Sequence, residues 1–521
     1  MKRTSLTTAV IAGIAGVAGI SNLANAVYLN GDGLGQALVY PYYTVNPSNG
    51  SANSTALTIV NTTNQGKAIK VRFLEGWNSR EVLDFNLYMS PYDVWTAQIV
   101  PNGIGAGVFS RDNSCTVPTL PTSAPGFAFS SFGYDGTTLP KDGGPTSLSR
   151  TTEGYVEMIE MGTVTNVSAN KTLTAITHVN GVPKNCAQLI TAFTPNSSNP
   201  YWVPNSGGNL STDIAAASGG LFGSGTIVNV VAGTVQGYNA EAIDRFWDAA
   251  PLATFIHTDP SSLAPSLSGG SSTTSYVFAQ TTANVSGSAL ITTDYPTGDG
   301  RDAVSSLFMA DTIYNEYWTG GGTALSSEWV VTFPTKRFYV DPPISFSSTV
   351  LPPFDVLFTK AAGNNGIPGS SCSPVGVGFY DREERTPGVQ LGNICPSPLT
   401  CGPQVTTTTL CYEANVVTFN QAGSSPSPGT SSVLGSSLVT PITTGYNNGW
   451  ANIDLVDIKE TTAHVLPSTA SSNRFLGLPA AGFWVAQFIN SNVSNGVLAN
   501  YTSLYKHKLH RACNTIDTAC S

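Results

Sequence analysis

The chain has 521 residues, of which 23 are Lys or Arg and 32 are Asp or Glu, so its formal net charge is −9. An acidic chain lacks the basic surface that phosphates require, which argues against nucleic acid as a partner. Charged residues make up only 11% of the chain, against about a quarter in average proteins, and Gly, Ser, Thr and Asn fill the polar positions, as is typical of short strands joined by tight turns.

The first 26 residues have the order of a secretory signal peptide. Two basic residues precede an apolar run, residues 9–20, and the small residues Ala24-Asn25-Ala26 follow, which predicts cleavage after Ala26. The apolar run is too short to span a membrane, and no later stretch reaches about 18 consecutive apolar residues, so we expect no integral membrane segment. We expect a bacterial protein that passes through the periplasm and is secreted to the extracellular space or the cell surface.

The predicted mature N-terminus combines a glycine-rich turn with an aromatic strand, residues 36–45. Asn30-Gly31-Asp32 is similar to the start of a calcium loop, but the next ligand positions hold Leu34 and Gln36 and no glutamate closes the loop, so we interpret it as a turn. The strand can complete its own sheet or insert into the sheet edge of a neighbouring molecule.

Residues 54–100 contain four runs in which apolar and polar side chains alternate. The apolar positions are Leu57 and Ile59; Ile69, Val71 and Phe73; Leu83, Phe85, Leu87 and Met89; and Trp95, Ala97 and Ile99. A period of two predicts antiparallel strands with one buried and one solvated face. With polar turns between the runs, the stretch predicts half of a β-sandwich.

The middle of the chain is predicted to alternate between loops and strands. Residues 101–150 are rich in Gly, Pro and Ser and predict long surface loops, and strands are expected at residues 153–161, 172–179, 187–193 and 225–235. Glu157 and Glu160 are three residues apart, which places them on opposite faces of a strand and argues against a cooperating acid and base.

Two segments have helical spacing. Residues 240–250 carry Ile243, Phe246 and Trp247 on one side, and Asp244 and Asp248 on the other. The two aspartates can form an acid–base pair or a solvated face, and the solvated face is the simpler explanation. A second short helix is expected within residues 301–318, and residues 328–340 predict two strands separated by a proline.

Residues 259–275 have the Ser, Gly and Pro content of a linker. We therefore predict an N-terminal β-sandwich domain at residues 27–258 and a C-terminal β-rich domain at residues 276–521.

The eight cysteines predict disulfides, because an even number in an exported chain is usually paired. They are Cys115, Cys186, Cys372, Cys395, Cys401, Cys411, Cys513 and Cys520. We expect Cys115 to pair with Cys186, Cys513 with Cys520, and the middle four to form two bridges. The alternative, a metal site among the middle four, lacks a C-x-x-C pair and a nearby histidine.

The sequence contains no G-x-S-x-G, H-E-x-x-H, Walker or dinucleotide-binding motif. Five charges at residues 381–385, including Glu383 and Glu384, form either a catalytic carboxylate cluster or an exposed turn, and we favour the turn. The histidines are mostly isolated and are expected to be structural. We predict no catalytic residue, no cofactor and no metal ligand, and favour a non-enzymatic protein while leaving an enzyme open.

The stretches ALTIVNTTNQGKAIKVRFLEG and LDFNLYMSPYDVWTAQI resemble the immunoglobulin-like sandwich domains of secreted bacterial surface proteins and the fibre-forming proteins of biofilm matrices. EGYVEMIEM and VVTFPTKRFYV resemble uncharacterised secreted proteobacterial proteins. The resemblance and the alternation together imply an all-β, mainly antiparallel fold: an immunoglobulin-like β-sandwich with long loop insertions and one or two short helices.

Three functions are compatible with these patterns. The leading hypothesis is a structural protein of the cell surface that self-associates into an extracellular filament or matrix by β-strand addition. The second is a secreted hydrolase or glycan-binding protein, with its site in residues 101–150 or 381–385. The third is an outer-membrane β-barrel, which alternation and aromatic residues favour and eight cysteines oppose.

Overall fold

The computed structural model describes residues 26–247, 256–281, 288–295, 300–320, 325–358, 369–383, 406–421, 431–456, 464–468, 470–490, 497, 499–514 and 520. Strands account for 47% of the structure and helices for 10%. Most strand pairs are antiparallel, so the predicted all-β, mainly antiparallel class is confirmed. Among the described residues, no helix combines the length and the apolar character needed to cross a bilayer.

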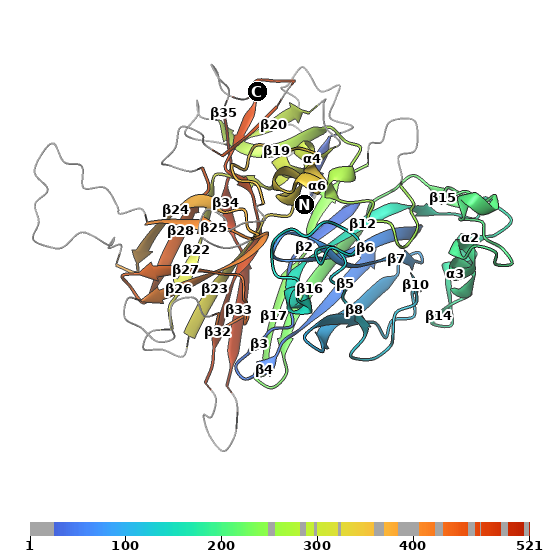
Figure 1. Cartoon of the computed structure of the whole chain (residues 1–521), viewed down its shortest axis with the longest axis horizontal. Coiled ribbons are helices and arrows are strands. Elements are labelled where there is room, and N and C mark those ends of the chain that lie inside the picture. The colour runs from blue at the N-terminus through green and yellow to red at the C-terminus, as the bar shows by residue number, and fades with distance from the viewer. Residues whose placement is uncertain are drawn as a thin grey trace, which may run out of the picture.

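The largest sheet has 13 strands and contains segments from both halves of the chain (Figure 1). Its strands are β1 (Val27–Leu29), β2 (Ala37–Thr44), β6 (Gly66–Glu75), β7 (Glu81–Met89), β10 (Cys115–Val117), β12 (Glu153–Val164), β15 (Ile214–Ala215), β18 (Glu241–Asp244), β19 (Thr274–Thr281), β20 (Ser288–Asp294), β29 (Val465–Pro467), β30 (Arg474–Leu476) and β35 (Ala512–Asn514). The order is β10-β7-β6-β12-β2-β18-β1-β19-β35-β30-β29, with β15 beside β12 and β20 beside β19. The two predicted domains therefore share one sheet, through the parallel pair β1 and β19.

A six-stranded sheet packs on the N-terminal part of this large sheet. Its order is β11-β9-β8-β5-β16-β17, and its strands are β5 (Ser54–Asn61), β8 (Val94–Asn102), β9 (Gly105–Phe109), β11 (Phe127–Ala128), β16 (Leu221–Asn229) and β17 (Thr234–Asn239). Apolar side chains from β5 and β8 interdigitate with those of β2, β6 and β7 in one cluster, which gives the sandwich arrangement of two sheets face to face.

Two five-stranded sheets and three two-stranded sheets complete the described β-structure. One sheet contains β22 (Thr312–Trp318), β24 (Ser373–Asp381), β25 (Thr406–Leu410), β28 (Asn448–Asp454) and β34 (Lys508–His510), and the other contains β23 (Leu325–Thr332), β26 (Ala414–Gln421), β27 (Val439–Thr444), β32 (Ala481–Phe488) and β33 (Tyr501–Lys506). The pairs are β3 (Pro47–Ser48) with β4 (Ser51–Ala52), β13 (His178–Val179) with β14 (Val182–Pro183), and β21 (Met309–Ala310) with β31 (Leu478–Pro479).

The helices are short. They are α2 (Thr172–Ile176), α3 (Ala187–Phe193), α4 (Arg301–Phe308), α5 (Arg337–Val340) and α6 (Pro342–Ser345), together with the 3₁₀ turns η2 (Leu148–Thr152), η3 (Pro204–Ser206) and η4 (Leu267–Gly269). In the described parts of the chain none of them exceeds eight residues, and such lengths are not stable in isolation, so their helicity depends on packing.

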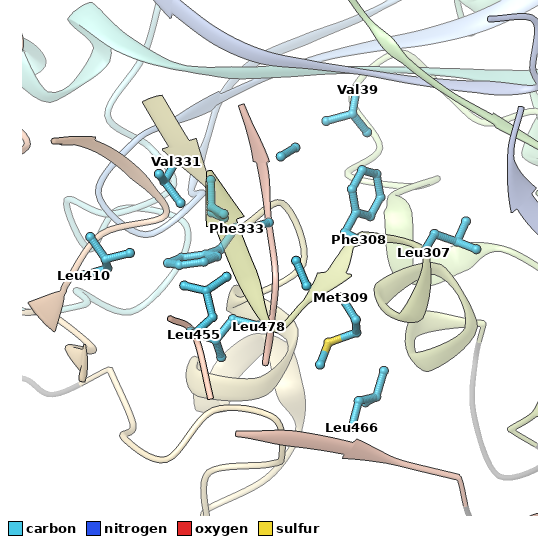
Figure 2. Close-up of a cluster of buried hydrophobic side chains, with 14 of the residues drawn as sticks. Val39, Leu307, Phe308, Met309, Val331, Phe333, Leu410, Leu455, Leu466 and Leu478 are labelled. Atoms are coloured by element: carbon cyan, nitrogen blue, oxygen red, sulfur yellow. The ribbon is translucent and has the colours of Figure 1, made fainter. Parts of the chain in front are cut away.

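The main hydrophobic core also joins the two halves. Val39 of β2 lies in the same cluster as Leu307 and Phe308 of α4 and Val331 of β23 (Figure 2). All four side chains are at most 1% exposed. Burial on this scale contributes about 25 cal/mol per Å² of apolar surface, so separation of the halves would expose a large part of the core.

The alternation in residues 54–100 correctly predicts four strands, β5 to β8, and the buried faces of β5 and β8. The pattern also predicts that one face of β6 is exposed to solvent, which is wrong. All ten residues of that strand are buried, including Lys67, Lys70 and Arg72. The reason is that β6 lies in the interior of the large sheet, where both faces are covered.

Three predicted elements have a different secondary structure. Residues 172–179 and 187–193 were expected as strands but contain α2 and α3, whose apolar residues pack around Trp202 in a separate small cluster. The helix expected at residues 240–250 begins instead as β18, because residues 241–243 pair with β2. Residues 248–250 lie outside the described part of the chain.

Two further segments agree only in part. Residues 301–318 start with the expected helix, α4, and continue as strands β21 and β22. In residues 328–340 the first strand is present as β23, but the second is the helical turn α5, whose four residues are all buried. Pro334 separates the two elements, and residues 334–336 form a turn that leads into α5.

The N-terminal aromatic strand completes its own sheet. β2 lies between β12 and β18, and all eight of its residues are buried. The sequence left open whether this strand completes its own sheet or inserts into a neighbouring molecule, and in the structure it completes its own sheet. β2 is thus an interior strand rather than a free donor segment.

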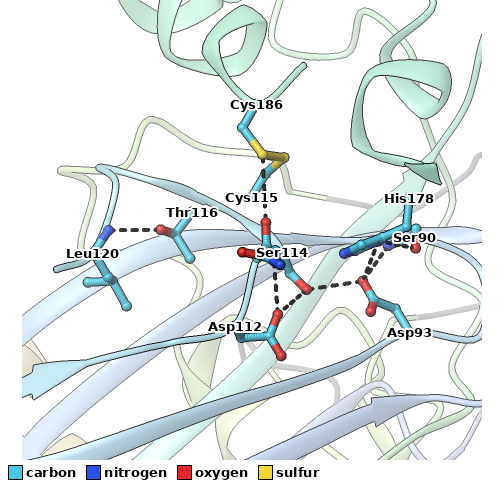
Figure 3. Close-up of a disulfide and its surroundings, with 10 residues drawn as sticks. Ser90, Asp93, Asp112, Ser114, Cys115, Thr116, Leu120, His178 and Cys186 are labelled. Atoms are coloured by element: carbon cyan, nitrogen blue, oxygen red, sulfur yellow. Dashed lines mark hydrogen bonds and ion pairs between the residues drawn. A yellow bond between two sulfur atoms is a disulfide. The ribbon is translucent and has the colours of Figure 1, made fainter. Parts of the chain in front are cut away.

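Three disulfides join described cysteines: Cys115 to Cys186, Cys372 to Cys411, and Cys513 to Cys520. The first links β10 to the residue before α3 (Figure 3). The first and the last bridges have the expected pairing, and the second joins two of the middle four cysteines. Cys395 and Cys401 lie outside the described residues.

Close packing of β12 on β6 yields a stability prediction at Gly154. A Cβ atom at this position would overlap the backbone carbonyl of Leu74. We expect Gly154→Ala to lower the free energy of unfolding by about 1–3 kcal/mol, the usual cost of overpacking. Gly237 on β17 is the matched control, because its Cβ would meet nothing closer than 3.8 Å. Urea denaturation of both variants measures the difference, and an equal effect would contradict the packing explanation.

Candidate functional site

Most of the charged side chains near the junction of the two halves are buried, and we call this group the buried charge network. Its members are Arg72, Glu75, Arg80, Glu81, Asp142, Arg150, Glu157, Lys336, Arg337, Asp341 and Glu413, each no more than 7% exposed. On one side they come from β6, β7, β12, η2 and the loops beside these elements. On the other side they come from α5, its flanking residues and the residue before β26. Buried charges require partners, so these contacts determine how the halves meet.

Arg150 forms the densest part of the buried charge network. Its guanidinium donates to both carboxylate oxygens of Glu75, at 2.7 and 2.9 Å, and its Nη1 donates to Asp142 at 2.9 Å. Glu75 also accepts the backbone N–H groups of residues 77, 78 and 80. A bidentate, fully hydrogen-bonded pair of this kind fixes both side chains in one geometry.

Arg72 connects three strands. It donates to Glu81 of β7 and to Glu157 of β12, each at 2.6 Å. The other oxygen of Glu157 lies 4.0 Å from Arg337, which donates to the carbonyl of Ser79 at 2.7 Å. Burial raises the pKa of Glu81 to about 7, although the neighbouring Arg72 opposes that shift.

Arg80 makes the direct link between the halves. Its Nη2 lies 2.8 Å from Asp341, 261 residues further along the chain. Asn78 also donates to Asp341, at 3.2 Å. Burial raises the pKa of Asp341 to about 6, and the Arg80 charge lowers it in part.

Glu413 and Lys336 have few partners of their own. Neither carboxylate oxygen of Glu413 has a hydrogen-bond partner in the described structure, and burial raises its pKa to about 8. The Lys336 ammonium donates to the carbonyls of Ser371 and Tyr412, at 2.6 and 3.3 Å, and burial lowers its pKa to about 8. Like Glu81, these two groups have a pKa within about one unit of neutral pH.

Two further buried glutamates hold residues 431–438. Glu328 of β23 accepts the backbone N–H groups of Ser432, Val433 and Leu434. Glu153 of β12 accepts the N–H of Ser437 at 2.8 Å and the hydroxyl of Tyr42 at 2.7 Å. Each carboxylate is thus used as a structural acceptor of backbone donors.

Ser90, His178 and Asp93 are close enough to suggest a catalytic triad, but the geometry does not support one. Ser90 Oγ is 2.9 Å from His178 Nδ1, and Asp93 lies 3.7 Å from the same nitrogen (Figure 3). In a working triad the serine and the carboxylate contact different ring nitrogens. Burial raises the pKa of Asp93, and the backbone N–H of Ser90 lowers it in part.

The histidines are hydrogen-bonded in structural positions. His257 lies between the carbonyl of Leu210 and the hydroxyl of Tyr88, each at 2.8 Å, and burial lowers its pKa to about 4. His507 contacts the carbonyl of Val330 at 2.9 Å, and burial also lowers its pKa to about 4. In the part of the chain that the structure describes, no group of three or more His, Cys, Asp or Glu residues is placed to hold a metal ion.

The acidic residues singled out in the sequence do not meet in one site. Glu157 and Glu160 point to opposite faces of β12, where Glu160 pairs with Lys67 at 2.9 Å. Asp244 accepts the hydroxyl of Tyr28 at 2.9 Å. Glu383 is exposed at the end of β24, while Glu384 and Asp248 lie outside the described residues.

A groove of about 680 Å³ lies between two sheet edges, β17 and β33. These strands lie side by side in the middle of the molecule (Figure 1), and Thr502 of β33 donates to the carbonyl of Val235 on β17 at 2.6 Å. Residues from β16, β18, β32 and the turn after β1 complete the walls. The volume lies in the range of ordinary ligand sites.

The charged residues of this groove are Glu241, Lys506 and Arg511. Lys506 Nζ lies 2.6 Å from Glu241, and its side chain is 58% exposed. Arg511 has no carboxylate partner among the described residues; the only described hydrogen bond of its guanidinium is a 3.4 Å contact from Nη2 to the carbonyl of Leu307, and its Nε is buried without a partner. Burial lowers the pKa of Arg511, and Glu241 raises it in part.

Sequence reasoning did not find this groove, since its two sides are more than 260 residues apart. The available signal was the basic segment at residues 506–511 in an otherwise acidic chain. Comparison with family models, with curated proteins and with solved structures found no match. The resemblance to immunoglobulin-like domains stays a prediction.

The Arg80–Asp341 pair is expected to be essential for stability. Arg80→Met leaves the Asp341 carboxylate buried without its cation, which costs about 3–5 kcal/mol. Lys506→Met is the matched control, because it breaks an ion pair of similar length that is exposed on the lysine side, and such pairs contribute at most about 1 kcal/mol. Chemical denaturation of both variants tests this; equal losses would show that burial does not decide the effect.

Glu413 is expected to make stability depend on pH. Its pKa in the folded state, about 8, lies above the ordinary value of 4.5. The native state therefore retains a proton that the unfolded chain has released, so the stabilisation is complete below about pH 4.5 and is lost as the pH rises through about 8.

Glu413→Gln removes this dependence. We expect the melting temperature of the variant, relative to that of the unmodified protein, to increase between about pH 5 and about pH 8. Glu316→Gln, an exposed position on β22, is the control for loss of one carboxylate. If the difference in melting temperature between Glu413→Gln and the unmodified protein stays constant across this pH range, the Glu413 carboxyl does not titrate there.

Proposed function

We propose that this chain is a non-enzymatic structural protein of the cell exterior, which self-associates by adding a β-strand to an open sheet edge. The single observation that carries the proposal is the edge of β20 in the large sheet, where the exposed residues 288–290 pair with β19 on one side and have no strand partner on the other among the described residues. Export is supported by the predicted signal peptide and by the disulfides, which persist in oxidising compartments. The described sheet also starts at Val27, directly after the predicted cleavage site.

β20 has the features of a strand-addition site. Within the described residues it pairs only with β19. At its far end the carbonyls of Thr292 and Asp294 accept hydrogen bonds from Asn473 and Ser468. The backbone groups of residues 290 and 288, two and four positions from Thr292, point to the same side and have no strand partner there among the described residues. Unpaired strand edges of this kind are templates for another chain.

The side chains at this edge favour association. Phe278 of β19 and Leu290 of β20 are directly opposite in the register, and they are 67% and 41% exposed. A cross-strand apolar pair on an exposed surface gains free energy when a partner covers it. Two other sheet edges are less available: β10 is joined by a disulfide to the residue before α3, and β17 lies along β33.

Leu290→Lys tests the proposal, because a lysine on an edge strand opposes the addition of another strand. We expect the mature unmodified protein to form oligomers or filaments in sedimentation velocity and negative-stain microscopy, and the variant to remain monomeric. Folding of the variant is checked by its circular dichroism and melting temperature.

Phe222→Lys is the matched control. Phe222 is also 41% exposed, but it lies on β16, which is paired on both sides and cannot accept another strand. Assembly that survives Phe222→Lys and not Leu290→Lys supports the proposal. A monomeric unmodified protein at all concentrations, or equal loss in both variants, contradicts it.

A further inference from the structure

We propose that the turn between β16 and β17, together with the adjoining start of β33, inserts into the headgroup region of a neutral, zwitterionic lipid bilayer. We call this region the valine tip and define it as Val230, Val231, Val235 and Tyr501. The inference goes beyond the proposed structural function and does not depend on self-association, since β20 lies at the opposite end of the molecule from this turn (Figure 1). It is carried by exposed apolar side chains, by an ordered turn and by two segments without charge.

The valine tip exposes more apolar surface than a turn usually does. Val230 and Val231 are 81% and 69% exposed, and Val235, near the start of β17, is 57% exposed. Gly, Asn, Asp and Ser are the usual turn residues, so two adjacent β-branched side chains depart from that preference. Tyr501 is 64% exposed, and the residues on either side of it donate hydrogen bonds to the carbonyls of Ala232 and Val235, at 2.5 and 2.6 Å. The four side chains therefore lie at one place on the surface, and a grouped apolar patch of this kind marks an interaction site.

Hydrogen bonds hold the turn in one conformation. Asn229 is 1% exposed; its side chain accepts the backbone N–H of Ala232 at 2.9 Å and donates to the carbonyl of Ser48, on β3, at 2.8 Å. Gly233 has a φ of +64°, which glycine adopts readily, and its N–H donates to the carbonyl of Val230 at 3.3 Å. Because the turn is already ordered, its insertion into another phase loses little conformational entropy.

Both segments of the valine tip are free of charge. Residues 221–240 and 481–505 contain no Asp, Glu, Lys or Arg. The first charged residues beyond them, Glu241 and Lys506, pair with each other at 2.6 Å. Lys506 follows Tyr501 by five residues, about 17 Å along an extended strand. Apolar faces of peripheral membrane segments sink about 5–10 Å into the boundary between headgroups and acyl chains, so the tip reaches that depth without taking either charge out of water.

Size and charge favour a lipid surface over a protein partner. A stable protein–protein interface takes about 20–30 residues a side and has a polar rim, whereas the valine tip has four apolar side chains between uncharged segments. A tyrosine beside apolar residues is typical of membrane–water interfaces, because its ring is apolar and its hydroxyl stays hydrated. Neither segment carries a cation for anionic headgroups, so the lipid is expected to be zwitterionic.

Flotation of the mature protein with phosphatidylcholine vesicles tests the proposal. We expect the protein to float with the vesicles and the bound fraction to be unchanged at high salt, because no ion pair contributes. Val231→Glu is expected to weaken partitioning about tenfold or more, since the apolar burial of one side chain is lost and a charge is added. Tyr501→Ser is expected to weaken it through loss of the ring. Both positions are exposed, and circular dichroism checks that both variants fold.

Val167→Glu is the matched control. Val167 is 88% exposed but lies between β12 and α2, far from the valine tip (Figure 1). Absence of vesicle binding, binding that high salt abolishes, or an equal loss in Val167→Glu and Val231→Glu would overturn the proposal. Unchanged partitioning in both Val231→Glu and Tyr501→Ser would also overturn it. Sedimentation velocity without lipid tests the protein alternative: an oligomeric state that changes in Val231→Glu makes the tip a contact between copies and overturns the lipid site.

Discussion

The architecture depends on ion pairs that are closed off from water where the two halves of the chain meet. A guanidinium or carboxylate loses several kcal/mol of hydration when it is buried, and recovers this only with a well-placed partner of opposite charge. Arg80 belongs to the N-terminal half and Asp341 to the C-terminal half, so neither half alone can satisfy its buried charge. The shared sheet and the shared core also make each half depend on the other. We therefore infer that the chain folds as one cooperative unit.

Charged residues are few in this chain, yet many of them lie in its interior. With 11% charged residues, the surface is left largely to hydroxyl and amide groups, while β6 buries Lys67, Lys70 and Arg72. Because a buried pair tolerates little displacement, these contacts specify the register between strands more sharply than apolar packing does. Thus Arg72, between Glu81 and Glu157, aligns β6 with both of its neighbours.

The sequence predicts local features better than long-range ones. The period-two pattern places β5 and β8 correctly, since one face of each is covered and the other is not. The same pattern assigns Lys70 and Arg72 to solvent, because nothing local indicates that residues 259 and 260 cover Lys70 or that Arg337 lies near Glu157, the partner of Arg72. Helices of five and seven residues, such as α2 and α3, are too short for their spacing to be distinguished from alternation. The groove was missed for the same reason as the buried charge network, as its walls are brought together only by the fold.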